Sequence, residues 1–233
     1  MRENFIFSEE TKPDLNLEEE EALFRMTEKD GIPRFRLWVN APSVILGRNQ
    51  KPEHFVHLDY CKKAGIPVLK RLSGGGAVYH DEGNLNFSLF LPNRYLALLD
   101  VHPLNFPSQF AVFSDIPLQA LFRLGIFAER REISSLFVRG RKISGCAMKN
   151  SRNAVLFHGT LLISTNLDEM EKTLKIPPGV TYSKHKDFVG TLHHLGYFVH
   201  LSEMKNFLFR SAEEFLRRCE EKVKLLCSGM GNM

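Results

Sequence analysis

The sequence predicts an α+β fold with a mostly antiparallel or mixed sheet and helices packed on one of its faces. Three observations lead to this prediction: strand-like segments outnumber helical ones, their connections are short, and no repeat or low-complexity linker interrupts the chain. At 233 residues, the chain is long enough to bury a sizeable core without disulfides or metals. We therefore expect residues 1–233 to form one domain.

The charge of the chain is modest and excludes several classes of partner. The chain has 31 Lys and Arg against 27 Asp and Glu, which gives a net charge of +4 and a pI near 8.9. This balance suits an anionic ligand or an acidic partner, but no basic run carries the interleaved aromatic residues of a nucleic-acid surface. No segment has the apolar length that spans a membrane, and the N-terminus has no secretory signal. We expect neither a nucleic-acid nor a membrane partner.

The cysteines and histidines do not form a metal-binding pattern. The four cysteines are Cys61, Cys146, Cys219 and Cys227. They include no C-x-x-C pair and no Cys/His cluster with zinc spacing. His193 and His194 are adjacent, and adjacent residues of a strand point to opposite faces. We predict four reduced thiols, a cytoplasmic protein and no metal-binding residues.

The N-terminal part of the chain predicts a helix followed by a hairpin. Residues 15–29 carry apolar residues at helical positions, Asn16 can cap this helix, and Gly31 can end it. The alternating segment 35–39 and the segment 43–47 are separated by a proline-containing turn. This order predicts two strands that pair as a hairpin.

The next part predicts a second helix and three strands. Residues 55–64 can form the helix, which Gly65 would end. Residues 68–70 form a short strand-like segment. Residues 77–80 and 86–91 predict two more strands, joined by a short turn that contains a glycine.

The remaining part alternates between helix and strand signals. Residues 110–124 are apolar at helical spacing and end at Gly125. Residues 135–138 and 142–147 predict a pair of short strands, and residues 154–163 predict another strand. The last helix is the clearest, and its apolar face consists of Leu208, Ala212, Phe215, Cys219, Val223 and Leu226.

A run of three glycines, Gly74–Gly76, lies between two predicted strands. Consecutive glycines cost backbone entropy, so a tight turn or a close-approaching ligand must account for them. The run lacks the Gly-Lys-Ser/Thr of a P-loop, and a strand follows it where a Rossmann fingerprint needs a helix. Two interpretations stay open. The run is a flexible turn, or its backbone N–H groups bind an anion together with Arg71 and Ser73.

Two further segments carry candidate site residues. Lys142 lies in the segment GRKISG at residues 140–145. It is either a solvated charge on a strand edge or a cation in a pocket, where it would stabilise negative charge. His158 lies in the predicted strand 154–163, where a single histidine is more often structural than catalytic.

Together, these segments resemble the lipoate–protein ligase A family. Residues 71–84, RLSGGGAVYHDEGN, are similar to the family's glycine signature, residues 140–147, GRKISGCA, to its lysine motif, and residues 158–162, HGTLL, to the segment after it. The segments LWVN and VILGRNQ, within residues 37–50, are similar to the family's first hairpin. The resemblance covers about residues 15–165.

The resemblance implies a fold shared with biotin ligases and the class II synthetase core. It implies a two-step reaction, in which lipoate and ATP give lipoyl-adenylate and pyrophosphate and the lipoyl group then passes to a lysine. The implied acceptors are lipoyl domains of 2-oxoacid dehydrogenase E2 subunits and the glycine-cleavage H protein. ATP and Mg²⁺ are the implied cofactors.

The resemblance also implies roles for individual residues. Lys142 would be the catalytic residue and contact both the acyl carbonyl and the α-phosphate. The implied ATP- and lipoyl-adenylate-binding residues are Arg71, Ser73, Gly74, Gly75, Gly76, Ala77, Val78, Tyr79, Asn84, Lys142, His158, Gly159 and Thr160. No protein nucleophile is needed, because the adenylate is itself the activated acyl donor.

The sequence departs from the family's pattern in two places. Many members carry a C-terminal accessory domain, for which we expect no room in residues 1–233. Completion of both half-reactions can therefore depend on a separate accessory chain. Residues 182–192 match the family's loop after the HGTLL segment only loosely, so we assign no role to them.

Two other functions stay open. An octanoyl or lipoyl transferase of the same fold works through an acyl-cysteine. One transferase type has its cysteine at the position of Val155, whereas Cys146 lies four residues after Lys142. The other alternative is a homologue that only binds lipoyl proteins, against which the presence of both Arg71 and Lys142 argues. A biotin ligase is disfavoured, because its Gly-Arg-Gly-Arg-x-Gly loop is absent.

Overall fold

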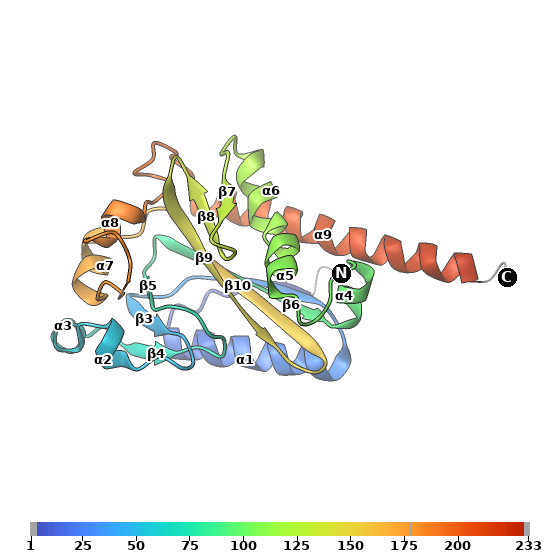
Figure 1. Cartoon of the computed structure of the whole chain (residues 1–233), viewed down its shortest axis with the longest axis horizontal. Coiled ribbons are helices and arrows are strands. Elements are labelled where there is room, and N and C mark those ends of the chain that lie inside the picture. The colour runs from blue at the N-terminus through green and yellow to red at the C-terminus, as the bar shows by residue number, and fades with distance from the viewer. Residues whose placement is uncertain (1–3, 178, 231–233) are drawn as a thin grey trace.

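The computed structural model describes residues 4–177 and 179–230, with side chains described up to residue 222 (Figure 1). The helices are α1 (Pro13–Asp30), α2 (Pro52–Phe55), α3 (Leu58–Ala64), α4 (Arg94–Leu98), α5 (Phe106–Phe113), α6 (Asp115–Arg123), α7 (Leu167–Thr173), α8 (His185–Phe188) and α9 (Leu201–Met230). The strands are β1 (Phe5–Phe7), β2 (Arg34–Trp38), β3 (Ser43–Leu46), β4 (Val68–Lys70), β5 (Val78–His80), β6 (Asn84–Pro92), β7 (Glu129–Arg131), β8 (Ser135–Val138), β9 (Arg141–Asn150) and β10 (Ala154–Leu162).

The strands form two sheets, which confirms the predicted α+β class. The large sheet has the order β1-β2-β6-β10-β9-β8-β7, and the small sheet has the order β4-β3-β5. Within the large sheet only the β1–β2 pair is parallel, and in the small sheet β3 is parallel to β4 and antiparallel to β5. Both sheets are therefore mixed, as the sequence predicts.

Helices cover both faces of the large sheet, so the prediction of helices on one face is wrong. On one face, Phe24 of α1 packs with Phe90 of β6 and Leu156 of β10. On the other face, Phe87 of β6 and Phe157 of β10 belong to the main core, together with residues of α5, α6 and α9. Every residue of β6 is buried, because alternate side chains of this central strand face different helices. In Figure 1, α1 runs along the lower side of the strands.

The predicted hairpin of residues 35–39 and 43–47 is wrong, because consecutive strands enter different sheets, whereas the predicted pair of residues 135–138 and 142–147 is confirmed as β8 and β9. Strand β2 lies in the large sheet, whereas β3 lies in the small one, and the same holds for β6 and β5. The chain leaves β2 at Asn40, which is fully buried. The Asn16 side-chain amide donates hydrogen bonds to the Val39 carbonyl (3.1 Å) and to Asn40 Oδ1 (2.9 Å). These bonds fix the chain where it crosses from one sheet to the other.

The helix ends differ from the predictions at several points. Helix α1 begins at Pro13, so Asn16 is not its cap but a buried residue inside it, while Gly31 ends the helix at a φ of 68° as predicted. The predicted helix 55–64 is divided into α2 and α3, since Val56 between them is extended and buried. The predicted helix 110–124 is likewise divided at Ser114 into α5 and α6.

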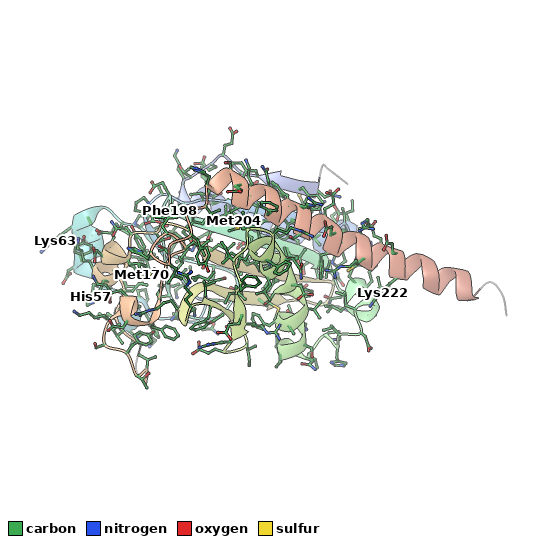
Figure 2. The ribbon with its side chains drawn as sticks, turned by 90° about the horizontal axis from the view of Figure 1, so that it is seen from above. His57, Lys63, Met170, Phe198, Met204 and Lys222 are labelled. Carbon is green, nitrogen blue, oxygen red and sulfur yellow. The ribbon has the colours of Figure 1, made fainter. Side chains whose placement is uncertain are left out.

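The predicted C-terminal helix is confirmed as α9. Its residues Leu208, Ala212, Phe215 and Cys219 are at most 3% exposed and pack on the main core. The predicted contacts of Val223 and Leu226 and the thiol state of Cys227 lie outside the described side chains. In Figure 2, α9 crosses the molecule above the sheet and extends past the other elements. Within the part of the chain that the structure describes, no helix has the length and apolar character to cross a membrane.

Gly159 on β10 allows close packing at the centre of the large sheet. A Cβ at this position would lie 2.6 Å from Phe87 Cζ, 2.8 Å from Cys146 Sγ and 3.1 Å from the Gly145 carbonyl oxygen. We therefore expect Gly159→Ala to lower the free energy of unfolding by about 1–3 kcal/mol in urea titrations. Gly74→Ala is the control, since a Cβ there meets nothing within 4 Å. Equal stability of the two variants would contradict this account of the packing.

Candidate functional site

Two adjoining cavities lie between the sheets and the loop Arg71–Ala77, which we call the glycine loop. The first cavity, of about 170 Å³, lies between the glycine loop, α1 and the strands β2, β6, β10 and β9. The second, of about 250 Å³, lies between the glycine loop, α7 and α8. The residues that line both cavities are Gly76, Ala77, Val78, Lys142, Gly145 and Thr160. A single ligand can therefore occupy both cavities and pass Lys142 at their junction.

Arg71 shapes the glycine loop from within. Its guanidinium donates hydrogen bonds to the carbonyls of Gly74 (2.6 Å) and Gly76 (2.8 Å), to the Ile45 carbonyl (3.2 Å) and to Ser73 Oγ (3.0 Å). Gly75 has a φ of 91°, a conformation that favours glycine, and a Cβ there would lie 2.9 Å from an Arg71 nitrogen. Because the carbonyls turn toward Arg71, they are kept from facing an anionic ligand.

Arg71 also contributes positive charge to the first cavity, which it lines. Burial lowers the pKa of Arg71 from 12.5 to about 10. The guanidinium therefore stays charged at neutral pH. Most of its donors are used inside the protein, so its charge acts on a ligand mainly through space.

A chain of buried side chains connects the glycine loop to α1. Ser73 Oγ lies 2.6 Å from His158 Nε2, and His158 Nδ1 lies 2.9 Å from Glu20 Oε1. Ser88 Oγ donates to the same Glu20 oxygen at 2.6 Å, and Trp38 Nε1 donates to Ser88 Oγ at 3.1 Å. These five side chains fix the orientation of His158 and Trp38, both of which line the first cavity.

Glu20 is ionised although it is only 1% exposed. Burial alone would raise its pKa, but His158, Ser88 and Arg36 outweigh this effect and hold the pKa below its ordinary value of 4.5. A carboxylate only accepts hydrogen bonds, so His158 Nδ1 carries a hydrogen and donates a hydrogen bond to Glu20 Oε1. Both nitrogens of His158 are thus engaged within the protein, and the ring is a positioned wall of the cavity.

Lys142 is directed to the junction of the cavities by an irregularity in β9. The register of β8 with β9 shifts between Leu136, which faces Ser144, and Phe137, which faces Lys142. The extra residue, Ile143, points into the main core and is fully buried. Such bulges re-aim neighbouring side chains and are frequent beside active sites.

The Lys142 ammonium has the charge environment of an anion-binding group. Burial is the main effect on its pKa and lowers it below the ordinary value of 10.5, while Glu132 acts in the opposite direction. Among the side chains and backbone groups that the structure describes, none accepts a hydrogen bond from its Nζ. A half-buried cation without a protein partner gains most from an anionic ligand.

The segment around α8 covers the second cavity. Tyr182 stacks on Phe188 at 4.8 Å, and both rings line the cavity. The carboxylate of Glu171 on α7 accepts from the His185 backbone N–H (2.8 Å) and lies 2.9 Å from His185 Nδ1. Arg141, next to Lys142, donates to backbone carbonyls of α8. The sequence analysis assigned no role to residues 182–192. The structure places this segment beside Lys142, which forms an isolated β-bridge with Val189.

Most of the residues predicted for the site come together, but three do not reach the cavity walls. The predicted residues that line the first cavity are Arg71, Gly75, Gly76, Ala77, Val78, Lys142, His158, Gly159 and Thr160, and Tyr79 lines the second. Ser73 lies behind the wall and holds His158, while Gly74 is exposed at the outside of the loop. Asn84 is fully buried and donates to Asn86, which does line the first cavity.

Sequence reasoning missed Glu20 and Asn86, and it included His80 in the glycine signature without a role of its own; all three line the first cavity. The sequence did contain a signal that Glu20 is buried. It lies three and four residues before Leu23 and Phe24, so helical spacing puts its carboxylate on the apolar face of α1. His80 and Asn86 lie in strands whose burial on both faces hides any alternation.

The role of Glu20 predicts how stability depends on pH. Since its pKa is lowered in the folded state, its contribution is complete above about 4.5 and is lost as the pH falls through the folded value. We expect Glu20→Gln to lower the free energy of unfolding at pH 7 by about 1–3 kcal/mol. The difference should shrink below pH 4.5 in urea titrations. Glu21→Gln, which removes only a surface pair with Arg25, serves as the control. A difference that is constant between pH 7 and pH 3 would refute the assignment.

Comparisons with known proteins point to one family. Residues 12–212 match the lipoyl protein ligase A/B catalytic domain. The chain is 38% identical over 174 residues to lipoate–protein ligase 1 of Staphylococcus aureus, in an alignment that covers 75% of this chain and 50% of that protein. The chain spans about half the length of the curated relatives it matches.

Solved structures give the same result over nearly the whole chain. A bi-partite lipoate protein ligase from Thermoplasma acidophilum, studied with its E2 lipoyl domain, has a TM-score of 0.78 and 28% identity, covering 95% of this chain and 89% of that one. A lipoate–protein ligase A bound with ATP has a TM-score of 0.79 and 27% identity, covering 96% and 93%. With the family model matching most of its length, the chain belongs to the lipoyl protein ligase A/B catalytic domain family.

Proposed function

We propose that this chain activates lipoate with ATP to lipoyl-adenylate and transfers the lipoyl group to a lysine of an acceptor protein. The observation that carries the proposal is the position of Lys142, whose ammonium lies at the junction of the two cavities and has no acceptor among the described residues. An acyl-adenylate has an anionic phosphate next to its acyl carbonyl. It therefore places charge at the point where a ligand that fills both cavities would meet Lys142.

The walls of the two cavities suit the two halves of such a ligand. The first cavity has Trp38, Leu17 and Ile45 along its length, which favours an extended apolar chain. The second has Phe55, Met170 and the stacked pair Tyr182 and Phe188, which favours a nucleoside base. The ATP bound to the related ligase and the lipoate in the names of the relatives support this assignment.

In the first step, a carboxylate oxygen of lipoate attacks the α-phosphorus of ATP, and pyrophosphate leaves. Both reacting groups are anionic, so their approach requires positive charge and directed N–H groups. Lys142 supplies a charge between them, and Arg71 adds a second charge nearby. Arg71 also holds the carbonyls of the glycine loop away from the ligand. Positioning by these residues carries the rate in this proposal.

In the second step, the amine of an acceptor lysine attacks the acyl carbonyl, and AMP leaves. We propose lipoyl domains of E2 subunits and the glycine-cleavage H protein as acceptors. The E2 lipoyl domain studied with the Thermoplasma ligase supports the first of these. His158 does not take the proton from the acceptor amine in this scheme, since Glu20 and Ser73 occupy its two nitrogens.

We propose that Mg²⁺ takes part as the complex of ATP rather than in a cage built by the protein. In the described part of the chain, no group of three His, Cys, Asp or Glu side chains is arranged to hold a metal ion. The side chains at the cavity junction are instead cationic or neutral. The donor set therefore does not fit a resident metal, and we derive no step through it.

The test incubates the protein with ATP, Mg²⁺, lipoate and an apo lipoyl domain and measures the mass of the domain. The proposal requires a mass gain of one lipoyl group that depends on ATP. A parallel reaction supplies preformed lipoyl-adenylate without ATP. Transfer in the second reaction alone would indicate that activation needs a separate accessory chain. We propose such a chain as a partner because the related Thermoplasma ligase is bi-partite. Absence of transfer in both reactions would overturn the proposal.

Lys142→Ala tests whether the Lys142 ammonium promotes adenylate formation. Because the ammonium is the charge nearest to both reacting groups, we expect lipoate-dependent adenylate formation to fall by about 10²–10³-fold. The melting temperature should hold, since the side chain has no protein partner to lose. Lys149→Ala is the matched control, because Lys149 lies on the same strand but lines neither cavity. Comparable loss in both variants would contradict the role of Lys142.

Cys146→Ser tests the alternative route through an acyl-cysteine. Cys146 lines the first cavity, but burial raises the pKa of its thiol to about 12, so the nucleophilic thiolate is scarce at neutral pH. We expect the serine variant to keep lipoyl transfer within about twofold of the wild type by mass spectrometry. Abolished transfer, or a covalent acyl-protein trapped on the wild type, would favour the transferase instead.

A further inference from the structure

His80 lines the first cavity and lies outside the second. The imidazole is 3% exposed and lines only the first cavity. Its ring packs edge-on against Trp38, with the ring centres 5.9 Å apart. His80 Nδ1 lies 3.2 Å from the Asn40 side-chain amide nitrogen. His80 Nε2, on the other side of the ring, is buried and has no partner among the groups that the structure describes.

The proton on His80 is fixed by a chain of side chains that begins at Arg36. A guanidinium only donates, and Arg36 donates to Asn16 Oδ1. The other end of the Asn16 amide is its nitrogen, which donates to Asn40 Oδ1 (2.9 Å) and to the Val39 carbonyl (3.1 Å). Asn40 consequently turns its nitrogen toward His80 and donates to Nδ1. Nδ1 is the acceptor of the ring, so Nε2 carries the hydrogen.

The ring also remains neutral over the working range of pH. Burial, with Arg71 and His158 nearby, lowers the pKa of His80 from 6.5 to about 3. The negative charge of Glu20 opposes this shift but does not outweigh it. His80 therefore presents a neutral N–H donor. Such a donor suits an uncharged acceptor atom of the ligand, unlike the ammonium of Lys142, which suits the anionic phosphate.

The position of His80 along β5 relates it to the reacting end of the ligand. Val78 lines both cavities, whereas His80, two residues further, lines only the first. Two residues of a strand span roughly 7 Å. A ligand whose carboxyl group lies at Lys142 thus brings the far part of its acyl chain toward His80 and Trp38.

We propose that the Nε2–H of His80 recognises an acceptor atom on the far part of the acyl group, and that this contact selects lipoate over octanoate. Lipoate carries two ring sulfurs there, which are weak acceptors, whereas octanoate ends in a methyl group. With octanoate, the donor stays unpaired as it is in the free protein, so only lipoate gains a hydrogen bond from His80. This inference rests on the proposed function and names the acid that its first cavity favours.

The experiment measures kcat/KM for adenylate formation with lipoate and with octanoate, in the wild type and in His80→Phe. We expect the wild type to prefer lipoate by about tenfold and the variant to bring the two acids within about twofold of each other. Ser114→Ala is the control, since Ser114 Oγ is another buried atom without a partner but lies between α5 and α6, away from both cavities. It should keep the wild-type ratio.

A second measurement on the wild type does not depend on how the variant folds. Nitrogen-15 NMR of histidine-labelled protein reads which ring nitrogen of His80 is protonated. We expect the Nε2–H form in the free protein and a shift of this nitrogen with lipoate that octanoate does not produce.

An Nδ1–H form, an equal response to both acids or an unchanged ratio in His80→Phe would overturn the inference. Adenylate formation with both acids in that case would leave the proposed function intact. Adenylate formation with neither acid would instead count against the activation step of the proposed function.

Discussion

The site depends on one buried chain of hydrogen bonds, which runs from Arg71 through Ser73 and His158 to Glu20. A run of three glycines has little conformational preference of its own, so its shape must come from its surroundings. Arg71 binds the loop carbonyls, and Ser73 links Arg71 to His158 on the central strand β10. Glu20 holds the other side of His158 from α1. The loop, the sheet and the first helix thus share one set of contacts, and the first cavity lies between them.

The same contacts explain why the face of α1 is unusually polar. Asn16 and Glu20 are buried on it, together with apolar Leu23 and Phe24. Buried polar groups stabilise a fold only when their partners are complete, and a complete network fixes a single arrangement. Here Arg36 orients Asn16, Asn16 orients Asn40, and Asn40 orients His80. Two such chains therefore set hydrogen-bonding directions at the cavity wall, one for His158 and one for His80.

Local patterns in the sequence predicted most elements but not their partners. The final helix, the strands 68–70 and 135–138 and the glycine that ends α1 follow from periodicity and from local backbone preferences. Most strand pairing does not, because it is decided by contacts distant in sequence; the exception is the predicted pair of adjacent strands that became β8 and β9. Asn16 illustrates this: a residue typical of a helix cap is buried inside the helix, where it holds the crossing at Asn40. The glycine and lysine motifs were recognisable as candidates. Their meeting across some seventy residues, and the covering of the second cavity by Tyr182 and Phe188, required the fold.

The central claim is that the two cavities hold the two halves of one acyl-adenylate, with Lys142 between them. The most direct test is a crystal structure of the chain with a non-hydrolysable lipoyl-sulfamoyl adenosine. The account predicts the lipoyl chain in the first cavity, the adenosine in the second, and the Lys142 ammonium within hydrogen-bond distance of both the acyl carbonyl and the sulfamate. An analogue bound with its adenosine outside the second cavity, or with Lys142 directed away from it, would contradict the account.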